Sequence, residues 1–293
     1  MKNIILKGGL GNQLFQLSKF LDVYNKGYKE IKIDVFTGFL LDFKYKRKLE
    51  INNLNKNIYH TKNFQNLINL FAIIFYKLAP NFLRLLRIKI IDDNSFFELE
   101  NMGNKNIIFN GYFQNFKILE SNIENIYEIV KPNFQKKKTR RFNNLISQIK
   151  NCENSVALGI RFYEESEDPL KHAALNTGVK KVEDFNKIIK IFEKKFINPI
   201  FFIFVQNENP FTRRLEFNSK FYIVSHANGY LGSWERLTAQ SYCKHHIFNN
   251  STFYYWGAVF SRFLNQNKNS DSEIYISDNF IFDQIYNPVW KKF

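Results

Sequence analysis

The 293-residue sequence predicts an α/β fold of two doubly wound domains. Short apolar runs alternate with helical patterns in both halves of the chain, which is typical of parallel sheets with crossover helices. The length also suits two domains of ordinary size. Segment 131–141 holds a proline followed by a cluster of five cations. This segment indicates an exposed linker between domain 1–141 and domain 142–293, with the start of a basic helix as the alternative.

Composition narrows the class of protein. Hydrophobic residues make up 45% of the chain and aromatic residues 17%, so general disorder is excluded. The net charge is +15, and residues 1–141 carry 24 Lys and Arg against 12 Asp and Glu. This basic half favours an anionic partner: a phosphate, a nucleic acid or an anionic lipid surface. Two cysteines are too few for a disulfide framework, and no signal-peptide core or membrane-length apolar run is present, so we expect a cytoplasmic protein.

In the first domain, apolar runs predict strands at 3–6, 31–36 and 107–109, and apolar residues at helical spacing predict a helix over 14–24. A Leu-, Phe- and Ile-rich helical insert, 64–91, is broken at Pro80 and interrupts this order. Two interpretations of the insert stay open. Its apolar face packs on the sheet, or it lies on an anionic membrane surface with Arg84, Arg87 and Lys89 toward the lipid headgroups.

In the second domain, the same alternation resumes. Apolar runs predict strands at 156–160, 199–205, 221–224, 246–249 and 274–277, of which 199–205 has the composition of a fully buried strand. Apolar periodicity predicts helices at 182–196, 234–243 and 252–264. We expect a ligand in a cleft between the two domains.

The first loop, 8–16, reads GGLGNQLFQ and joins a strand to a helix. Its glycines allow close approach of a ligand, and N–H groups at a helix start attract anions. One interpretation is a dinucleotide site with Asp34 as the ribose ligand, although Leu14 stands where a third glycine belongs. Another is a phosphate or sugar loop with Asn12 and Gln13 directed at the ligand, and the simplest is a tight turn.

Two further clusters lie at predicted strand ends. Arg161 ends the strand 156–160, where a guanidinium suits a phosphate, and the acidic residues Glu164, Glu165, Glu167 and Asp168 follow. A carboxylate there is a candidate general base, or the loop is merely a solvated acidic loop.

The other cluster, 249–258, places Ser251 and Thr252 at a helix start. The aromatic residues that follow are more often part of a hydrophobic core than a surface on which a substrate stacks. The adjacent His245 and His246 diverge on a regular element, and no metal-binding spacing is present.

Together these blocks resemble family 11 glycosyltransferases, the bacterial α-1,2-fucosyltransferases. GGLGNQLFQ matches the N-terminal signature of the family, Gly111-Tyr112-Phe113-Gln114 its central G-Y-[FW]-Q block, and 241–258 its pattern S-x-C-K-H-N-I-I-A-N-S-[ST]-F-S-W-W-G-A. The order and spacing of the blocks fit over nearly the whole chain.

The middle motif departs from the family. H-x-R-R-x-D becomes Gly159-Ile160-Arg161-Phe162-Tyr163-Glu164, so the histidine and the second arginine are lost. Where the family often has S-D-D after the buried strand, this chain has Val205-Gln206-Asn207, which weakens the expectation of a guanine nucleotide.

The resemblance implies two Rossmann-like domains facing each other across a cleft, of GT-B type, and inverting transfer of L-fucose from GDP-fucose to a hydroxyl of an acceptor glycan in α-1,2 linkage. It implies catalytic roles for Arg161 and Glu164, with Asp168 and Glu165 in reserve as the base. The donor-binding residues it implies are Gly9, Gly11, Asn12, Gln13, Arg161, Asn250, Ser251, Thr252 and Phe253.

No Asp-x-Asp motif is present, so we expect no metal and no cofactor, with Arg161 and the helix start at Ser251 neutralising the leaving diphosphate. The expected partners are the nucleotide sugar, an acceptor oligosaccharide of surface-polysaccharide or O-antigen type that is lipid-linked, and an anionic membrane surface. That surface would make the protein peripheral at the inner face of the membrane. The alternatives are an inactive or donor-switched relative and, more remotely, a nucleic-acid-binding protein.

Overall fold

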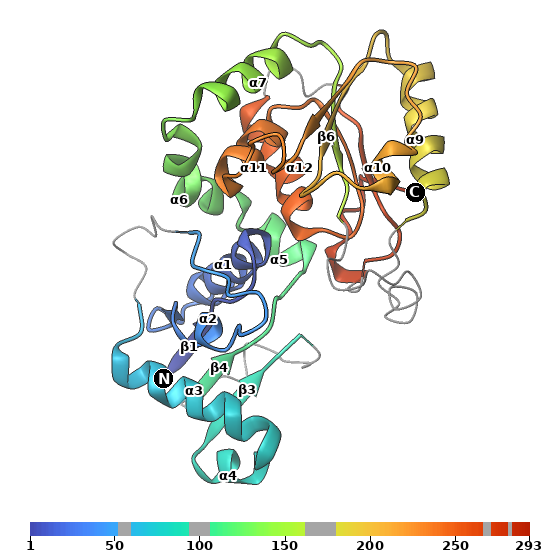
Figure 1. Ribbon diagram of the computed structural model, residues 1–293. Helices are drawn as coiled ribbons and strands as arrows, with labels where there is room; N and C mark the ends of the chain where they lie inside the picture. Colours follow the sequence, from blue (N-terminus) through green and yellow to red (C-terminus); the bar gives the residue numbers. More distant parts are fainter. Residues whose placement is uncertain (52–59, 94–105, 162–179, 266–270, 281–282) are drawn as a thin grey trace. The chain divides into compact units, whose positions relative to one another are not determined.

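The computed structural model describes residues 1–51, 60–93, 106–161, 180–265, 271–280 and 283–293 (Figure 1). The chain divides into two compact units, Met1–Pro132 (unit 1) and Asn133–Phe293 (unit 2). Each unit has its own parallel sheet and its own core, which confirms the α/β fold class with two Rossmann-like domains. The division at 132/133 falls within helix α6, Ile123–Gln135, and the basic cluster of segment 131–141 ends in the first residues of helix α7, Arg140–Lys150, as the alternative of a basic helix start expected.

Unit 1 is built on a four-stranded sheet in the order β2-β1-β4-β3, with every neighbouring pair parallel. Its strands are β1 Lys2–Ile5, β2 Lys32–Asp34, β3 Ile88–Ile91 and β4 Asn106–Phe109. Its helices are α1 Leu10–Asn25, α2 Thr37–Leu40, α3 Asn63–Leu78, α4 Pro80–Leu85, α5 Phe116–Glu120 and α6. The end of the 64–91 insert is therefore a strand, β3, where the sequence predicted helix.

Unit 2 carries a six-stranded parallel sheet in the order β10-β9-β8-β5-β6-β7, which is the strand order of a Rossmann fold. The strands are β5 Ser155–Gly159, β6 Ile200–Phe204, β7 Phe221–Val224, β8 His245–Phe248, β9 Ile274–Ile276 and β10 Lys291–Lys292. The helices are α7 Arg140–Lys150, α9 Val182–Lys195, α10 Pro210–Arg213, α11 Ser233–Ser241, α12 Thr252–Leu264 and the 3-10 turn Asp283–Ile285. All the strands and helices that the sequence predicted in this half are present.

The core of unit 2 explains the aromatic composition. Phe201, Phe202 and Phe204 of β6 are fully buried, and Phe185 and Phe192 of α9 pack against the same sheet. Strand β6, which reads IFFIF, therefore contains no polar residue, as expected for a parallel strand that is covered on both faces.

Two histidines are buried within this core. His245 and His246 of β8 have no exposed surface, and burial lowers the pKa of each to about 3. One nitrogen of each ring is partnered: Glu273 N donates to His245 Nδ1 over 3.1 Å, and His246 Nε2 lies 3.2 Å from the Cys243 carbonyl. Both histidines are neutral core residues.

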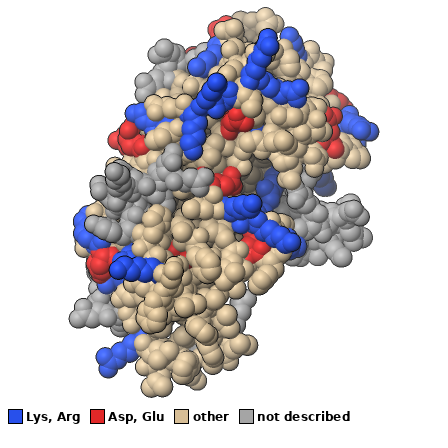
Figure 2. Space-filling view, turned by 60° about the vertical axis from the view of Figure 1, so that its left-hand side comes forward, with Lys and Arg blue, Asp and Glu red and all other residues tan. Residues whose placement is uncertain are grey.

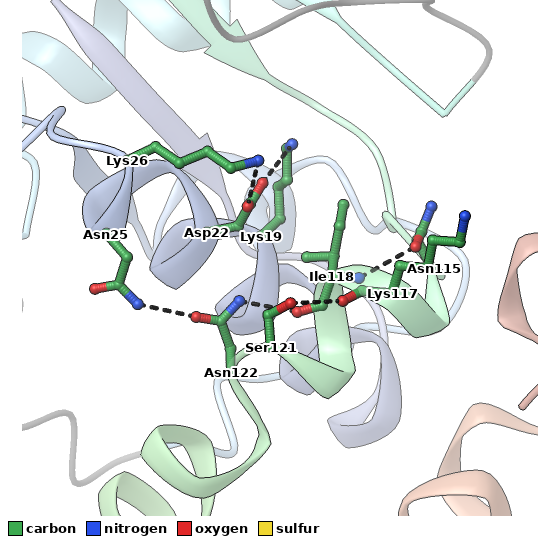
Figure 3. Close-up of polar contacts among 9 residues, drawn as sticks. All are labelled: Lys19, Asp22, Asn25, Lys26, Asn115, Lys117, Ile118, Ser121 and Asn122. Carbon is green, nitrogen blue, oxygen red and sulfur yellow. Dashed lines mark hydrogen bonds and ion pairs between the residues drawn. The ribbon is translucent and has the colours of Figure 1, made fainter.

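Helix α1 is fixed at its C-terminal end by polar contacts with the segment after α5 (Figure 3). Asp22 accepts from Lys19 over 3.1 Å and from Lys26 over 2.8 Å, and Asn25 Nδ2 donates to Asn122 Oδ1 over 3.0 Å. Lys19 is buried, and burial lowers its pKa. These contacts hold the helix whose N-terminus forms the glycine loop. Among the described residues, none of the helices is long and apolar enough to cross a membrane.

Candidate functional site

The glycine loop connects β1 to α1 and requires glycine at its first position. Gly8 has φ of 76°, and a Cβ atom there would lie 2.9 Å from Asn12 Nδ2 and 3.2 Å from the Tyr112 ring. Gly9 is the N-cap residue of α1, and a Cβ there would meet, within 4 Å and among the described residues, Arg47 alone at 3.8 Å. The loop therefore leaves an approach to the helix start at Gly9.

Gln13 uses its whole side-chain amide inside the protein. Its Nε2 donates to the Gly8 carbonyl over 2.9 Å and to the Lys48 carbonyl over 3.0 Å, and its Oε1 accepts from Glu50 N over 2.9 Å. Gln13 and the neighbouring Gly11 are both buried. In this structure Gln13 tethers the glycine loop to segment 48–50, so any contribution to donor binding acts through the shape of the loop.

Gln16 has the same kind of role between the two central strands of unit 1. Its Oε1 accepts from Lys7 N over 2.9 Å, and its Nε2 donates to the Gly111 carbonyl over 3.1 Å. Lys7 Nζ donates to both the carbonyl and the side-chain oxygen of Asn110, each over 2.8 Å. These bonds join the loop after β1 to the loop after β4, where the order of the sheet reverses.

The groups around this edge of unit 1 include donors for an anion and also the Asp93 carboxylate, which accepts from Tyr112 N over 2.8 Å. Asn12 Oδ1 accepts from Gln114 Nε2 over 3.2 Å, and Arg47 is half-buried beside Gly9. Burial raises the pKa of Tyr112, against the opposing effect of Arg47, so its phenol stays protonated and able to donate. The sequence did not single out Arg47, because it lies outside the glycine motif in a segment without periodicity.

Asp34 is not available as a ribose ligand. The carboxylate is fully buried, and its Oδ1 accepts from Phe36 N and Thr37 N, each over 2.8 Å. Its Oδ2 accepts from Thr37 Oγ1 over 2.6 Å and from Asn69 Nδ2 over 2.7 Å. With its acceptor positions used, Asp34 does not support the dinucleotide interpretation.

In unit 2, Arg161 lies at the point where the strand order reverses. It follows β5 and is half-buried, and its N–H donates to Asn249 Oδ1 over 2.7 Å, while Asn249 Nδ2 donates back to the Arg161 carbonyl over 2.9 Å. Asn249 follows β8, the strand next to β5. This reciprocal pair fixes the backbone of Arg161 at the carboxyl edge where ligands of doubly wound sheets bind.

The start of α12 lies directly after Asn249. Ser251 is the buried N-cap residue, and its side chain makes no capping hydrogen bond, which differs from the expected capping. Thr252 and Phe253 are half-buried in the first turn, and Asn250 Nδ2 donates to the Asn279 carbonyl over 3.3 Å. Asn249 thus links the backbone of Arg161 to the segment that leads into α12, and the binding of a donor by these residues stays a prediction. Tyr254, Tyr255 and Trp256 are buried, in agreement with a core role.

Gly159 leaves room for Tyr254. A Cβ on Gly159 would clash with the ring of Tyr254, and the Tyr254 hydroxyl donates to the Ile160 carbonyl over 3.2 Å. The family 11 pattern that the sequence resembles has a histidine and a serine at these two positions, where this chain has a glycine and a tyrosine. Burial raises the pKa of Tyr254, and the nearby Arg236 and Arg161 act in the opposite direction.

Arg236 is the functional candidate that sequence reasoning missed. It is 8% exposed, its Nη2 donates to the Val205 carbonyl over 2.8 Å, and its Nη1 lies 2.8 Å from His226 Nε2. Its Nε has no hydrogen-bond partner, and no carboxylate pairs with it, within the part of the chain that the structure describes. Buried cations are normally paired, so this guanidinium is suited to receive an anion. No motif marks a lone arginine within a helix.

Other predicted residues lie outside the described ranges. They are Glu164, Glu165, Glu167 and Asp168, so the position of a general base stays a prediction. Across the described residues, no group of three or more His, Cys, Asp or Glu could hold a metal ion.

Comparisons with known proteins identify no family for this chain. No protein-family model matches it, and no curated protein is significantly similar in sequence. One similar solved structure is a mutant of Arabidopsis thaliana FUT1 in complex with GDP, with a TM-score of 0.49 and 10% identity over 93% of this chain and 69% of that one. Another is a glycosyl transferase family 9 protein from Veillonella parvula, with a TM-score of 0.43 and 12% identity over 94% of this chain and 80% of that one. At these values the matches carry no argument about activity, and membership of family 11 stays a prediction.

Proposed function

We propose that this chain is an inverting glycosyltransferase that moves L-fucose from GDP-fucose to a hydroxyl of an acceptor glycan, in α-1,2 linkage. The observation that carries the proposal is the Arg161–Asn249 pair at the reversal point of a Rossmann-order sheet, next to the start of α12. Cations and helix N-termini at such an edge bind diphosphates. The sequence blocks that resemble family 11 supply the choice of fucose.

In the proposed reaction an acceptor hydroxyl oxygen attacks the anomeric carbon as the bond to the β-phosphate oxygen breaks. Charge develops on the departing GDP, and Arg161, Arg236 and the N–H groups at the start of α12 stabilise it. Arg236 thereby supplies the second positive charge that the middle motif lacks at Phe162. The proton of the attacking hydroxyl goes to a carboxylate, for which Glu164 is the first choice.

Unit 1 offers the glycine loop, with Gly9 open and Asn12 and Arg47 beside it, as the second contact for donor or acceptor. The acceptor we propose is a galactose-type sugar on a lipid-linked oligosaccharide of surface-polysaccharide or O-antigen synthesis. Because every charge-stabilising group named here is a side chain or an N–H group, the proposed mechanism is independent of metal.

A donor panel tests the proposal. Purified protein is incubated with GDP-fucose, GDP-mannose, UDP-galactose and UDP-N-acetylglucosamine, with β-galactosides as acceptors and with EDTA in excess, and release of the nucleotide is measured. We expect turnover of GDP-fucose that EDTA does not reduce. Turnover of a uridine donor alone would reject the guanine assignment, and loss with EDTA that Mn²⁺ restores would reject the metal-free mechanism. Binding of GDP-fucose without turnover would identify the inactive relative.

A further inference from the structure

Helix α3 presents its apolar residues to solvent. Phe64 is 73% exposed and Leu78 is 75% exposed, and Leu85 of the following helix α4 is 78% exposed. We call the whole exposed set the apolar face: Phe64, Leu67, Phe71, Ile74, Leu78, Phe82, Leu85 and Leu86. In Figure 2 the end of unit 1 that carries α3 and α4, at the bottom of the view, is drawn mostly tan, with few charged side chains. A contiguous apolar surface of this kind marks an interaction site.

The inward side of the N-terminal half of α3 is polar, which explains why the apolar face points outward. Asn69 has no exposed surface, its Nδ2 donates to Asp34 Oδ2 over 2.7 Å, and its Oδ1 accepts from Asn3 Nδ2 over 2.9 Å. Asn66 is also buried and bonds with Thr61. Turning the helix to bury its apolar face would break these bonds and leave the buried Asp34 carboxylate short of a donor, which is costly.

The segment is mostly basic. Residues 51–91 contain six Lys and Arg and no Asp or Glu, and Asp92, which accepts from Tyr76 of α3 over 3.4 Å, follows directly. Arg84 within the apolar face and Arg87 and Lys89 after it are all exposed. An apolar helix face flanked by cations is the pattern of helices that lie in the interface of an anionic bilayer. A second copy of the chain is a less favourable partner for the apolar face than a bilayer, because pairing this region with itself would bring like charges together.

We propose that the apolar face binds the surface of an anionic lipid bilayer, with α3 lying in the boundary between headgroups and acyl chains and Arg84, Arg87 and Lys89 at the headgroups. No residue of the apolar face takes part in the proposed reaction, so the inference does not depend on that reaction. It is compatible with the other interpretation of the insert, because Ala72 and Leu83 on its inward side pack with Ile5 and Ile108 of the sheet.

Vesicle flotation tests the proposal with the full chain and no nucleotide sugar. The probes are vesicles of phosphatidylcholine with 30% phosphatidylglycerol and vesicles of phosphatidylcholine alone. The first variant, made entirely at exposed positions, combines Phe64→Ser, Phe71→Ser, Leu78→Ser and Leu85→Ser. A second variant combines Arg84→Gln, Arg87→Gln and Lys89→Gln.

The matched controls lie in unit 2. Ile197→Ser with Leu231→Ser and Val289→Ser removes equally exposed apolar side chains, and Lys187→Gln with Lys194→Gln and Arg213→Gln removes exposed charges. Thermal unfolding of every variant checks that the fold is retained, because no altered residue is buried.

We expect wild-type protein to bind the anionic vesicles at low salt and to bind them at least tenfold more weakly at high salt or without phosphatidylglycerol. The serine variant should lose at least tenfold in partitioning, and the glutamine variant on the order of 100-fold, at about fivefold per charge. Both controls should bind like wild type. Absence of wild-type binding at low salt, equal binding by the serine variant, or a dimer that the serine variant dissociates while vesicles are ignored would each overturn the proposal. None of these readouts involves transfer of a sugar, so failure here is distinct from failure of the proposed function.

Discussion

The carboxyl edges of the two sheets occupy the same place in two similar topologies but are built differently. After β1, the side-chain amides of Gln13 and Gln16 form hydrogen bonds with backbone groups of unit 1. After β5, Asn249 fixes the backbone of Arg161, and Arg236 is buried without a carboxylate partner within the described residues. The difference teaches that a polar residue at a strand end is a ligand candidate only after its internal hydrogen bonds have been counted. Changes in unit 1 should therefore act on stability, and changes in unit 2 on catalysis.

The largest effect is expected at Arg161. Arg161→Ala should lower kcat/KM for GDP-fucose by at least about 10²-fold, the usual scale for a group that stabilises transition-state charge. Arg161→Lys should not restore the rate, because an ammonium cannot make a two-pronged contact with a phosphate. Steady-state kinetics measure both, with Arg213→Ala on the exposed end of α10 as the control. A fully active lysine variant would show that a point charge is sufficient.

Arg236→Met should separate activity from stability. The variant leaves the Val205 carbonyl without the guanidinium donor, so the free energy of unfolding measured in urea should fall by no more than about 1–3 kcal/mol. If Arg236 stabilises the departing diphosphate, kcat/KM should fall by about tenfold or more. A variant that unfolds more easily but retains its kcat/KM would make Arg236 a structural residue. The carboxyl edges of the two sheets would then not differ in the way described above.

Substitutions at Gly159 and Tyr254 should be energetically coupled. Gly159→His forces a side chain into the Tyr254 ring and should cost about 1–3 kcal/mol of unfolding free energy. In the double variant with Tyr254→Ser the two costs should not add, with a coupling of at least about 1 kcal/mol. Urea unfolding of the two single variants and the double variant measures the coupling. Strict additivity would mean that the exchange of large and small residues between strand and helix is coincidental.

Gln13→Ala should show the opposite behaviour to Arg161→Ala. It leaves Glu50 N and two carbonyls without their partner, so we expect a loss of about 1–3 kcal/mol in the stability of unit 1. At a temperature where the variant is folded, kcat/KM should change less than tenfold. The exposed Gln148→Ala on α7 is the matched control and should be silent. A large loss of rate in a fully stable Gln13 variant would place this side chain on the ligand after all.

The sequence predicted most of the fold because apolar runs and periodicity report burial directly. It missed β3, since Ile88–Ile91 continues the apolar composition of the helices before it, and it missed β10, which is two lysines held at a sheet edge. Periodicity showed that α3 has two faces but not which one meets water, because that depends on the partners of Asn69 across the sheet. The same limit hid Arg236 and Arg47, whose importance arises from neighbours distant in sequence.

Because His245 and His246 are buried, unfolding of unit 2 is coupled to the binding of protons by these two side chains. In the folded chain the pKa of His245 and His246 is about 3, whereas an unfolded histidine titrates near 6.5. The unfolded chain therefore binds more protons between these values, so stability is fully present above about pH 6.5 and falls as the pH drops toward 3, by up to about 2.7 kcal/mol per pH unit for the pair. Urea unfolding at pH 7 and pH 5 should show this loss, and His246→Phe should halve it. Mild acid should therefore destabilise unit 2 before most of its carboxylates are protonated.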